Sequence, residues 1–301
     1  MKNKYVLVVG MLCVILAVSM GLTTLYVTHQ KEGSDRQEFT VVTSFYPIYL
    51  ATLNVAKDIP GVKVENLSEP QTGCLHDFQL TPEDMKRLST AEVFVVNGGG
   101  IEGFLEEVAS SYSRLKMIQA CEPVELLSDG EETNAHAWMS PARYREMVQY
   151  IALELSEADP AHESAYQKNA DAYDARIEKL EKRMEALADA ASGTKVILFH
   201  EAFDYVLEDC GMQVCLVMDL DEERQVSAGE IADVVAAVQE ERASLILAEE
   251  RYGRALAELV QKETDVAVLY LDPLTRGSYD PDSYLSGMEQ NIERLQQYFV
   301  P

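Results

Sequence analysis

Three of the five histidines stand at the edges of predicted secondary-structure elements. His76 and His136 each come just before a predicted helix, and His200 ends a predicted strand. In parallel α/β sheets, ligand sites gather at the carboxyl ends of the strands. Imidazole nitrogens suit a borderline-soft divalent metal, above all Zn²⁺. One such histidine alone could equally cap a helix or fill a packing position, but three together predict a metal site.

A fourth ligand to this metal should be a carboxylate. Asp272 directly follows the last predicted strand, which makes it the favoured direct ligand. Glu249 and its neighbour Glu250 follow another predicted strand and are the alternative. Either of these two could instead be a structural acid that pairs with Arg251 or Arg254.

The elements that must position these residues alternate short β-rich runs with helical stretches. The expected strands are Thr40–Phe45, Val62–Leu67, Val93–Asn97, Lys195–Phe199, Gln213–Met218, Leu245–Ala248 and Val266–Leu271. The expected helices include Pro47–Asp58, Ala202–Glu208, Ile231–Glu240, Ala255–Lys262 and a last one from Asp280-Pro281 to about Tyr298. Further helix starts are marked at Thr81-Pro82, Ser140-Pro141, Asp159-Pro160 and the Ser227–Glu230 capping box. This alternation predicts an α/β fold with mainly parallel sheets flanked by helices.

One stretch breaks the alternation and predicts a long helix. After Pro160 no glycine or proline occurs up to about Ala191. Apolar residues recur there at spacings of four and three, namely Tyr166, Ala170, Tyr173, Ile177, Leu180, Met184 and Leu187. Some 32 residues would form a rod of about 48 Å. We expect this rod to join two lobes and to limit their opening, although a coiled-coil dimer is the alternative.

The N-terminus is expected to be a membrane segment. No residue from Tyr5 to Val27 is charged, and Lys2 and Lys4 precede this stretch. As a helix it would span roughly 35 Å, enough for a bilayer core. A cleaved signal peptide ending near Ala17–Ser19 is the alternative, and a lipoprotein acylated at Cys13 fits less well because a leucine precedes it. All three interpretations place the folded part outside the cytoplasm, anchored at the cell surface or secreted.

The expected organisation follows from these segments. It consists of a signal peptide or anchor over 1–28, a tether over 29–38, an N-terminal α/β lobe over 39–159, the linking helix over 160–191 and a C-terminal α/β lobe over 192–301.

Charge and cysteine content narrow the possible partners. The formal net charge is −26, so the surface repels phosphate backbones and excludes nucleic acid as a partner, while it favours cations. Outside the cytoplasm two disulfides are possible. A bridge between Cys210 and Cys215 across Gly211 would leave Cys74 with Cys121, and four free thiols are the alternative.

From about Val41 to the C-terminal helix, the residues resemble the metal-binding component of ABC import systems for zinc and manganese. The similar motifs are Val42–Pro47, His76-Asp77-Phe78 with Thr81-Pro82, His136-Ala137-Trp138-Met139, Phe199–Phe203 and Leu271–Leu274. The resemblance implies two lobes joined by a long rigid helix, with one metal ligand in each of the last four motifs. Manganese members tend to have glutamate at the third ligand position, so His200 implies zinc.

The sequence departs from this family in three places. Many zinc members insert a His-rich loop between the first two ligands, but Glu122–Thr133 is short and lacks histidine. Asn134-Ala135 stands where Asp-Pro is common, and Glu249–Tyr252 lacks a common proline. These changes leave all four ligand types in place.

The expected function is the capture of Zn²⁺ by His76, His136, His200 and Asp272, two ligands per lobe, and its delivery to an ABC permease. Mn²⁺ is the alternative cargo, and the chain is expected to be monomeric and not an enzyme. A zinc hydrolase would need an open coordination position, which Asp272 fills. An adhesion protein would need no metal. Because neutral imidazoles bind metal best above a pKa near 6.5, acidification should weaken binding.

Overall fold

The computed structural model describes residues 16, 18–20, 38–69, 78–129, 132–220 and 224–300. Thr40–Pro301 form one compact unit. Within the described residues, no helix is both long enough and apolar enough to cross a membrane. The predicted membrane segment Tyr5–Val27 lies almost wholly outside the described residues, and the lobe boundaries near residues 159 and 191 stay a prediction.

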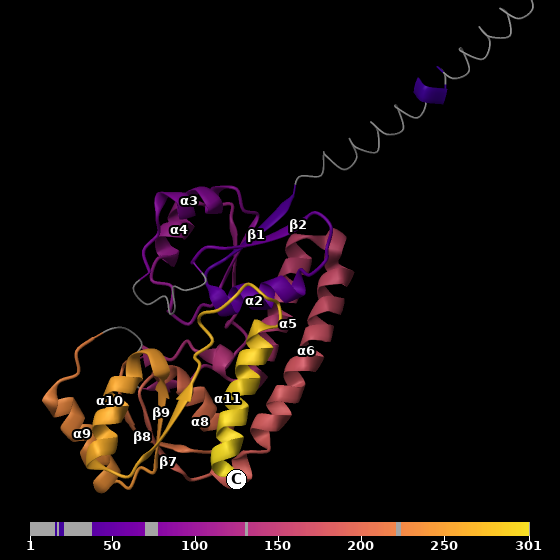
Figure 1. Cartoon of the computed structure of the whole chain (residues 1–301). Coiled ribbons are helices and arrows are strands. Elements are labelled where there is room, and N and C mark those ends of the chain that lie inside the picture. The colour runs from indigo at the N-terminus through magenta and orange to yellow at the C-terminus, as the bar shows by residue number, and fades with distance from the viewer. Residues whose placement is uncertain are drawn as a thin grey trace, which may run out of the picture. The chain divides into compact units, whose positions relative to one another are not determined.

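The N-terminal lobe is built on a four-stranded sheet with the order β2-β1-β3-β4. Its strands are β1 (Phe39–Thr43), β2 (Val62–Asn66), β3 (Val93–Val96) and β4 (Lys116–Gln119). The pairs β1/β3 and β3/β4 are parallel, as predicted. The lobe's helices are α2 (Tyr46–Val55), α3 (Pro82–Ser89) and α4 (Leu105–Ser111) (Figure 1). Thr81 caps α3 in a capping box, which confirms that predicted helix start.

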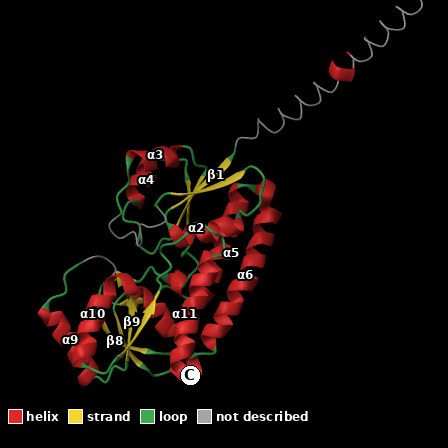
Figure 2. Ribbon diagram, viewed as in Figure 1, coloured by secondary structure: helices red, strands yellow, loops and turns green. Residues whose placement is uncertain are grey.

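The C-terminal lobe contains a second four-stranded sheet, with the order β10-β9-β7-β8. The strands β7 (Lys195–Leu198), β8 (Gln213–Val217), β9 (Leu245–Glu249) and β10 (Ala267–Leu271) are all parallel to their neighbours. One face of this sheet packs against α9 (Ala228–Gln239) and α10 (Glu250–Glu263), and α8 (Asp204–Asp209) follows β7. Figure 2 shows both sheets flanked by helices, so the predicted two-lobed α/β class is confirmed.

Three long helices run beside the lobes: α5 (Pro141–Ala158), α6 (Glu163–Glu185) and α11 (Ser283–Phe299) (Figure 1). Every residue of the predicted apolar stripe is buried. This stripe packs within the chain, because α6 contacts α5, α2 and α11. The coiled-coil alternative is therefore unnecessary.

The predicted continuous helix over 160–191 is wrong in its length. A 3₁₀ turn at Pro160–His162 precedes α6, and a separate short helix, α7 (Ala188–Ala191), follows it. The amide of Leu187 donates to the carbonyl of Met184, an i→i+3 bond that tightens the last turn and ends the α-helix. No glycine or proline marks this break in the sequence.

The predicted bridge between Cys210 and Cys215 is also wrong. Both are free thiols, as is Cys121. The Sγ atom of Cys210 lies 3.4 Å from Sδ of Met184 in the buried contact with α6, whereas Cys215 lies in β8. Cys74 lies outside the described residues.

Candidate metal-binding site

His136 is a fully buried side chain at the start of the 3₁₀ turn Ala137–Met139, which leads into α5. Asn97, just after β3, donates from Nδ2 to the carbonyl of Ala135 at 2.9 Å. Trp138 packs against the imidazole with ring centroids 4.9 Å apart and donates from Nε1 to the carbonyl of Pro273 at 2.8 Å. The N-terminal lobe therefore holds His136 on a fixed backbone beside the segment that follows β10.

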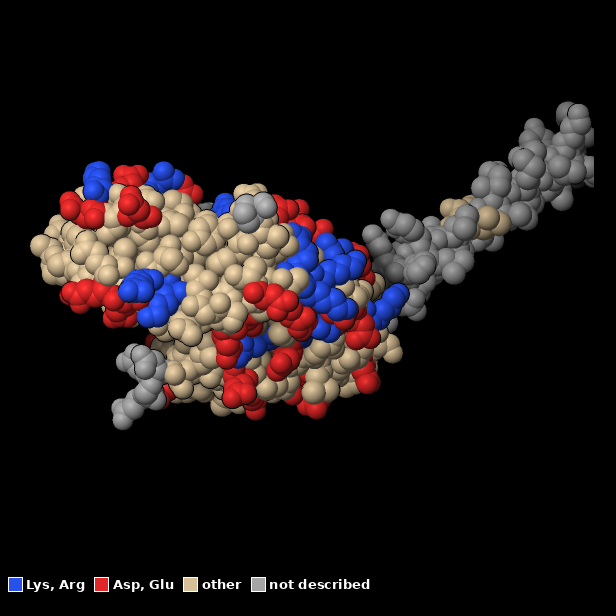
Figure 3. Space-filling model, turned by 90° about the horizontal axis from the view of Figure 1, so that it is seen from below, with Lys and Arg blue, Asp and Glu red and all other residues tan. Residues whose placement is uncertain are grey.

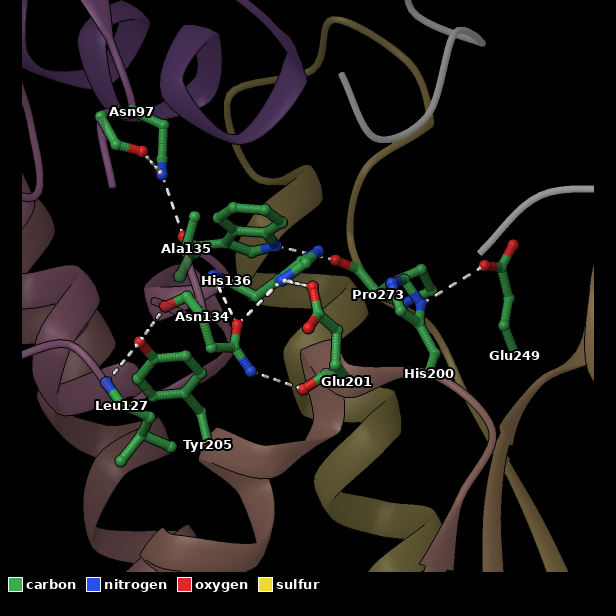
Figure 4. Close-up of polar contacts among 12 residues, drawn as sticks. Asn97, Leu127, Asn134, Ala135, His136, His200, Glu201, Tyr205, Glu249 and Pro273 are labelled. Atoms are coloured by element: carbon green, nitrogen blue, oxygen red, sulfur yellow. Dashed lines mark hydrogen bonds and ion pairs between the residues drawn. The ribbon is translucent and has the colours of Figure 1, made fainter. Parts of the chain in front are cut away.

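His200 follows β7 in the C-terminal lobe and is also fully buried. It stands past the carboxyl end of a parallel strand, as predicted. The ring centroids of His136 and His200 lie 5.2 Å apart, and the planes are nearly perpendicular at 84°. Two of the predicted ligands, 64 residues apart in the sequence (200 − 136), thus meet between the lobes (Figure 4).

The hydrogen-bond partners of His136 come from both lobes. Its Nδ1 lies 2.9 Å from Oδ1 of Asn134 and 3.4 Å from Oε1 of Glu201. Asn134 Nδ2 donates to the carbonyl of Glu201 at 2.9 Å, and Tyr205 Oη donates to the carbonyl of Asn134 at 2.6 Å. Figure 4 shows these contacts converging on the segment that carries His136.

Glu249, at the end of β9, lies beside His200 but is tied to an arginine. Its Oε2 is 3.8 Å from Nδ1 of His200, and its Oε1 accepts from Arg276 at 2.9 Å. Burial raises the pKa of Glu249 to about 7, although the Arg276 guanidinium opposes this shift. Glu250, the other alternative ligand, forms an ion pair with Arg254 on the surface of α10.

Asp272 follows β10 in a rigid backbone setting. Its amide donates to Oδ1 of Asn291 at 2.8 Å, and its carbonyl accepts from Nδ2 of the same asparagine at 2.7 Å. Its Oδ1 accepts from the amide of Leu274 at 2.8 Å. The side chain lines a pocket of about 260 Å³ together with Glu249 and Arg276, and desolvation raises the pKa of its carboxyl. Asp272 and Glu249 therefore share one polar pocket.

His76, the remaining predicted ligand, lies outside the described residues. Among the side chains that the structure does describe, no three of His, Cys, Asp and Glu are grouped closely enough to hold a metal ion. The four-ligand set His76, His136, His200 and Asp272 thus stays a prediction. The part of it that is described consists of the two apposed imidazoles and the neighbouring carboxylate pocket.

The sequence analysis did not predict the contacts of three residues near the site. These are the contacts of Asn134 and Glu201 with His136 and the contact of Arg276 with Glu249. Asn134 precedes His136 by two residues, and Glu201 follows His200 directly. Sequence proximity was the only available signal for these two. Arg276 reaches Glu249 across 27 positions, which no local pattern could indicate.

A family model described as "ZnuA: Zinc-uptake complex component A periplasmic" matches residues 41–298. The chain is 27% identical to the zinc-binding lipoprotein AdcA of Streptococcus pneumoniae, over 98% of this chain and 61% of the relative. It is 26% identical to the iron-binding protein YfeA of Yersinia pestis, over 95% of this chain and 94% of the relative. The chain thus spans about three fifths of the length of AdcA.

Among solved structures, the chain is similar to Zn(II)-bound AdcA from Streptococcus pneumoniae. The TM-score is 0.76 at 28% identity, with 88% of this chain and 58% of that chain covered. The two-lobed fold is therefore shared with a protein whose structure contains bound zinc.

Proposed function

The chain belongs to the ZnuA family of zinc-uptake components, and from this premise we propose that it captures Zn²⁺ outside the cytoplasm and delivers it to an ABC-type membrane importer. His76, His136, His200 and Asp272 are the proposed ligands. The observation that carries the proposal is the pair of buried imidazoles, His136 and His200, that meet from different lobes. Zn²⁺ is cargo here and is released to the importer.

The spacing of the two imidazoles suits one tetrahedral zinc ion. Zn–N bonds of about 2 Å at a tetrahedral angle place the centroids of two coordinating rings roughly 5 Å apart. The observed centroid separation of His136 and His200 is 5.2 Å. Little reorganisation of these two ligands would therefore be needed when the ion binds.

Asp272 is the proposed carboxylate ligand in preference to Glu249. Glu249 lies on the Nδ1 side of His200 and accepts from Arg276, a position from which it can orient the imidazole. Asp272 stands on a backbone that Asn291 fixes at both its amide and its carbonyl. An anionic ligand held in this way would offset part of the charge of Zn²⁺.

Membership of a solute-binding family separates this function from the hydrolase alternative, and the chain is not an enzyme. Other divalent cargo is the second candidate, because the similar protein YfeA is named as iron-binding and Mn²⁺ was expected as an alternative. We propose that the chain acts as a monomer, with its N-terminal segment serving as a membrane anchor or a cleaved signal.

Elemental analysis and zinc titration test the proposal. Protein purified without added metal should contain about one zinc per chain, and calorimetry should give tight binding. His136→Ala and His200→Ala should each weaken zinc binding by about 100-fold or more, because each removes a direct ligand. His162→Ala is the matched control, since His162 lies at the start of α6 and pairs with Asp159. Zinc affinity unchanged in both site variants would refute the proposal, and manganese or iron in place of zinc would establish the other cargo.

A further inference from the structure

The orientation of the Asn134 side chain is fixed by two neighbours that each allow only one kind of hydrogen bond. The backbone amide of His136 can only donate, so the side-chain atom of Asn134 that faces it at 3.0 Å is the oxygen, Oδ1. The carbonyl of Glu201 can only accept, so the atom that faces it at 2.9 Å is the amide nitrogen, Nδ2. The two constraints agree.

This orientation determines the tautomer of His136. Nδ1 lies 2.9 Å from Oδ1 of Asn134, which is an acceptor, so Nδ1 carries the proton. The second nearby group, Oε1 of Glu201 at 3.4 Å, is also an acceptor and favours the same tautomer. In the neutral imidazole, Nε2 is then the nitrogen that can bind a metal.

The two acceptors belong to different lobes. Asn134 precedes α5, whereas Glu201 directly follows His200 in the C-terminal lobe. The Asn134–Glu201 hydrogen bond crosses between the lobes, and the side chain of Glu201 is 37% exposed. Any separation of the lobes would therefore remove one of the two acceptors from His136.

We propose that Asn134 and Glu201 are positioning residues that jointly hold His136 with Nε2 available to the metal. The inference rests on the proposed function, because His136 is taken as a ligand of the cargo ion. Its consequence is that the affinity of a ligand on one lobe depends on a side chain carried by the other. Opening of the lobes would then leave His136 oriented by Asn134 without the contact to Glu201.

The tautomer can be measured on the full-length chain without metal. In protein labelled with ¹⁵N-histidine, with His136 assigned by comparison with His136→Gln, we expect the Nδ1–H form. Asn134→Ala/Glu201→Ala should lose this preference because both acceptors are gone. Asn134→Asp should keep it, because a carboxylate still accepts from Nδ1. An Nε2–H tautomer in the unaltered chain, or a mixture in Asn134→Asp, would overturn the inference.

Zinc affinity supplies the second readout. Loss of groups that orient a metal-bound histidine typically weakens binding by about 10- to 100-fold. We expect a loss of this size in the double alanine variant and a loss larger than the product of the two single losses, since one acceptor compensates for the other. Glu208→Ala is the matched control, because Glu208 forms an ion pair with Arg143 of α5 and does not face the imidazole.

The outcomes distinguish this inference from the proposed function. Two results would refute only the positioning role, provided that the unaltered chain binds zinc. In the first, the affinity loss of the double variant equals the product of the two single losses. In the second, the zinc affinity of the double variant is within twofold of that of the unaltered chain. Absence of zinc binding by the unaltered chain, together with the expected tautomer, would refute only the cargo. If the double variant does not fold without metal, the tautomer of His136 measured in Asn134→Asp tests the positioning role.

Discussion

Glu102 is a buried carboxylate outside the metal site, only 3% exposed, in the loop after β3. It accepts from Ser44 Oγ at 2.8 Å and from the amides of Asn97 and Gly98 at 2.7 and 3.0 Å. Burial nevertheless raises the pKa of Glu102 to about 7. The folded protein therefore retains a proton here that the unfolded chain releases near pH 4.5.

Because of this retained proton, the folded state becomes less stable as pH rises through this range. Between pH 4.5 and about 7 the folded state binds more protons at this residue, so its contribution to the free energy of unfolding falls as pH rises. The total change is on the order of 3 kcal/mol. Glu102→Gln should make the slope of unfolding free energy against pH less negative in this window, measured by urea unfolding. An unchanged slope would show that Glu102 titrates normally.

A comparison of Asp272→Asn with Glu249→Gln tests the choice of carboxylate ligand. Asp272→Asn should weaken zinc binding by about 100-fold because a direct anionic ligand is lost, whereas Glu249→Gln should cost about tenfold or less. Competition with a chelating dye measures both affinities. If the order is reversed, Glu249 is the ligand.

At the residue scale the sequence predicted that His136 and His200 lie together, because chemically able residues at strand and helix ends are visible without coordinates, and the two rings do meet. Their role as metal ligands stays a prediction. The sequence could not supply the atoms around them. Which nitrogen of His136 faces Asn134, and which acid Arg276 reaches, depend on rotamers and on contacts between distant segments. Tertiary packing determines both contacts, and no periodic pattern in the sequence indicates which distant side chains pack together.

Among the elements, the strap between β10 and α11, residues 272–282, connects the two lobes. It starts with Asp272 and ends on the N-terminal lobe, where Tyr46 Oη donates to the carbonyl of Ser278 and Asn54 Nδ2 donates to the carbonyl of Pro281. Tyr279 packs against Tyr49 with ring centroids 4.4 Å apart and ring planes tilted by 47°. The strap thus links the proposed carboxylate ligand to the opposite lobe.

Removal of the Tyr279 hydroxyl tests how strongly the strap is held to the N-terminal lobe. This hydroxyl donates to the carbonyl of Ser68 at 3.2 Å and accepts from Nδ2 of Asn66 at 3.3 Å. Asn66 is the last residue of β2, and Ser68 follows the strand. Tyr279→Phe should lower the unfolding free energy by about 1 kcal/mol and speed zinc dissociation, measured by urea unfolding and stopped-flow chelation. Tyr298→Phe, near the end of α11, is the control. Equal dissociation rates in both variants would contradict a role for the strap in retention.

Elements were predicted best where periodicity and caps agree. The Ser227–Glu230 capping box starts α9, as expected. The last helix, in contrast, begins at Ser283 and not at Asp280-Pro281, because Asp280 Oδ1 accepts from the amide of Asp282 in a turn before the helix. Local side-chain bonds of this kind compete with helix starts and shift boundaries by a few residues.

For the molecule as a whole, the dominant feature is its charge of −26. Figure 3 shows acidic side chains spread across the face in view, with basic side chains gathered in fewer places. Such a field raises the local concentration of cations and speeds their capture. The sequence composition alone predicts this property, because net charge does not depend on the fold.

The rate of zinc association should therefore depend on salt. Raising the ionic strength from about 0.02 M to about 0.5 M shortens the screening length from about 20 Å to about 4 Å, and the association rate should fall severalfold. Stopped-flow mixing with an inert sodium salt measures the effect, and added sucrose controls for viscosity. A rate independent of salt would mean that the acidic surface does not steer the cation.

The protonation of the described cysteines determines whether their sulfur atoms could bind Zn²⁺ in place of the proposed ligands. Burial raises the pKa of Cys121 and of Cys210 to about 12, and that of half-buried Cys215 is raised as well. Zinc bonds to thiolates, and these sulfurs stay protonated in any physiological medium. These three described thiols therefore do not compete with the proposed ligands for Zn²⁺.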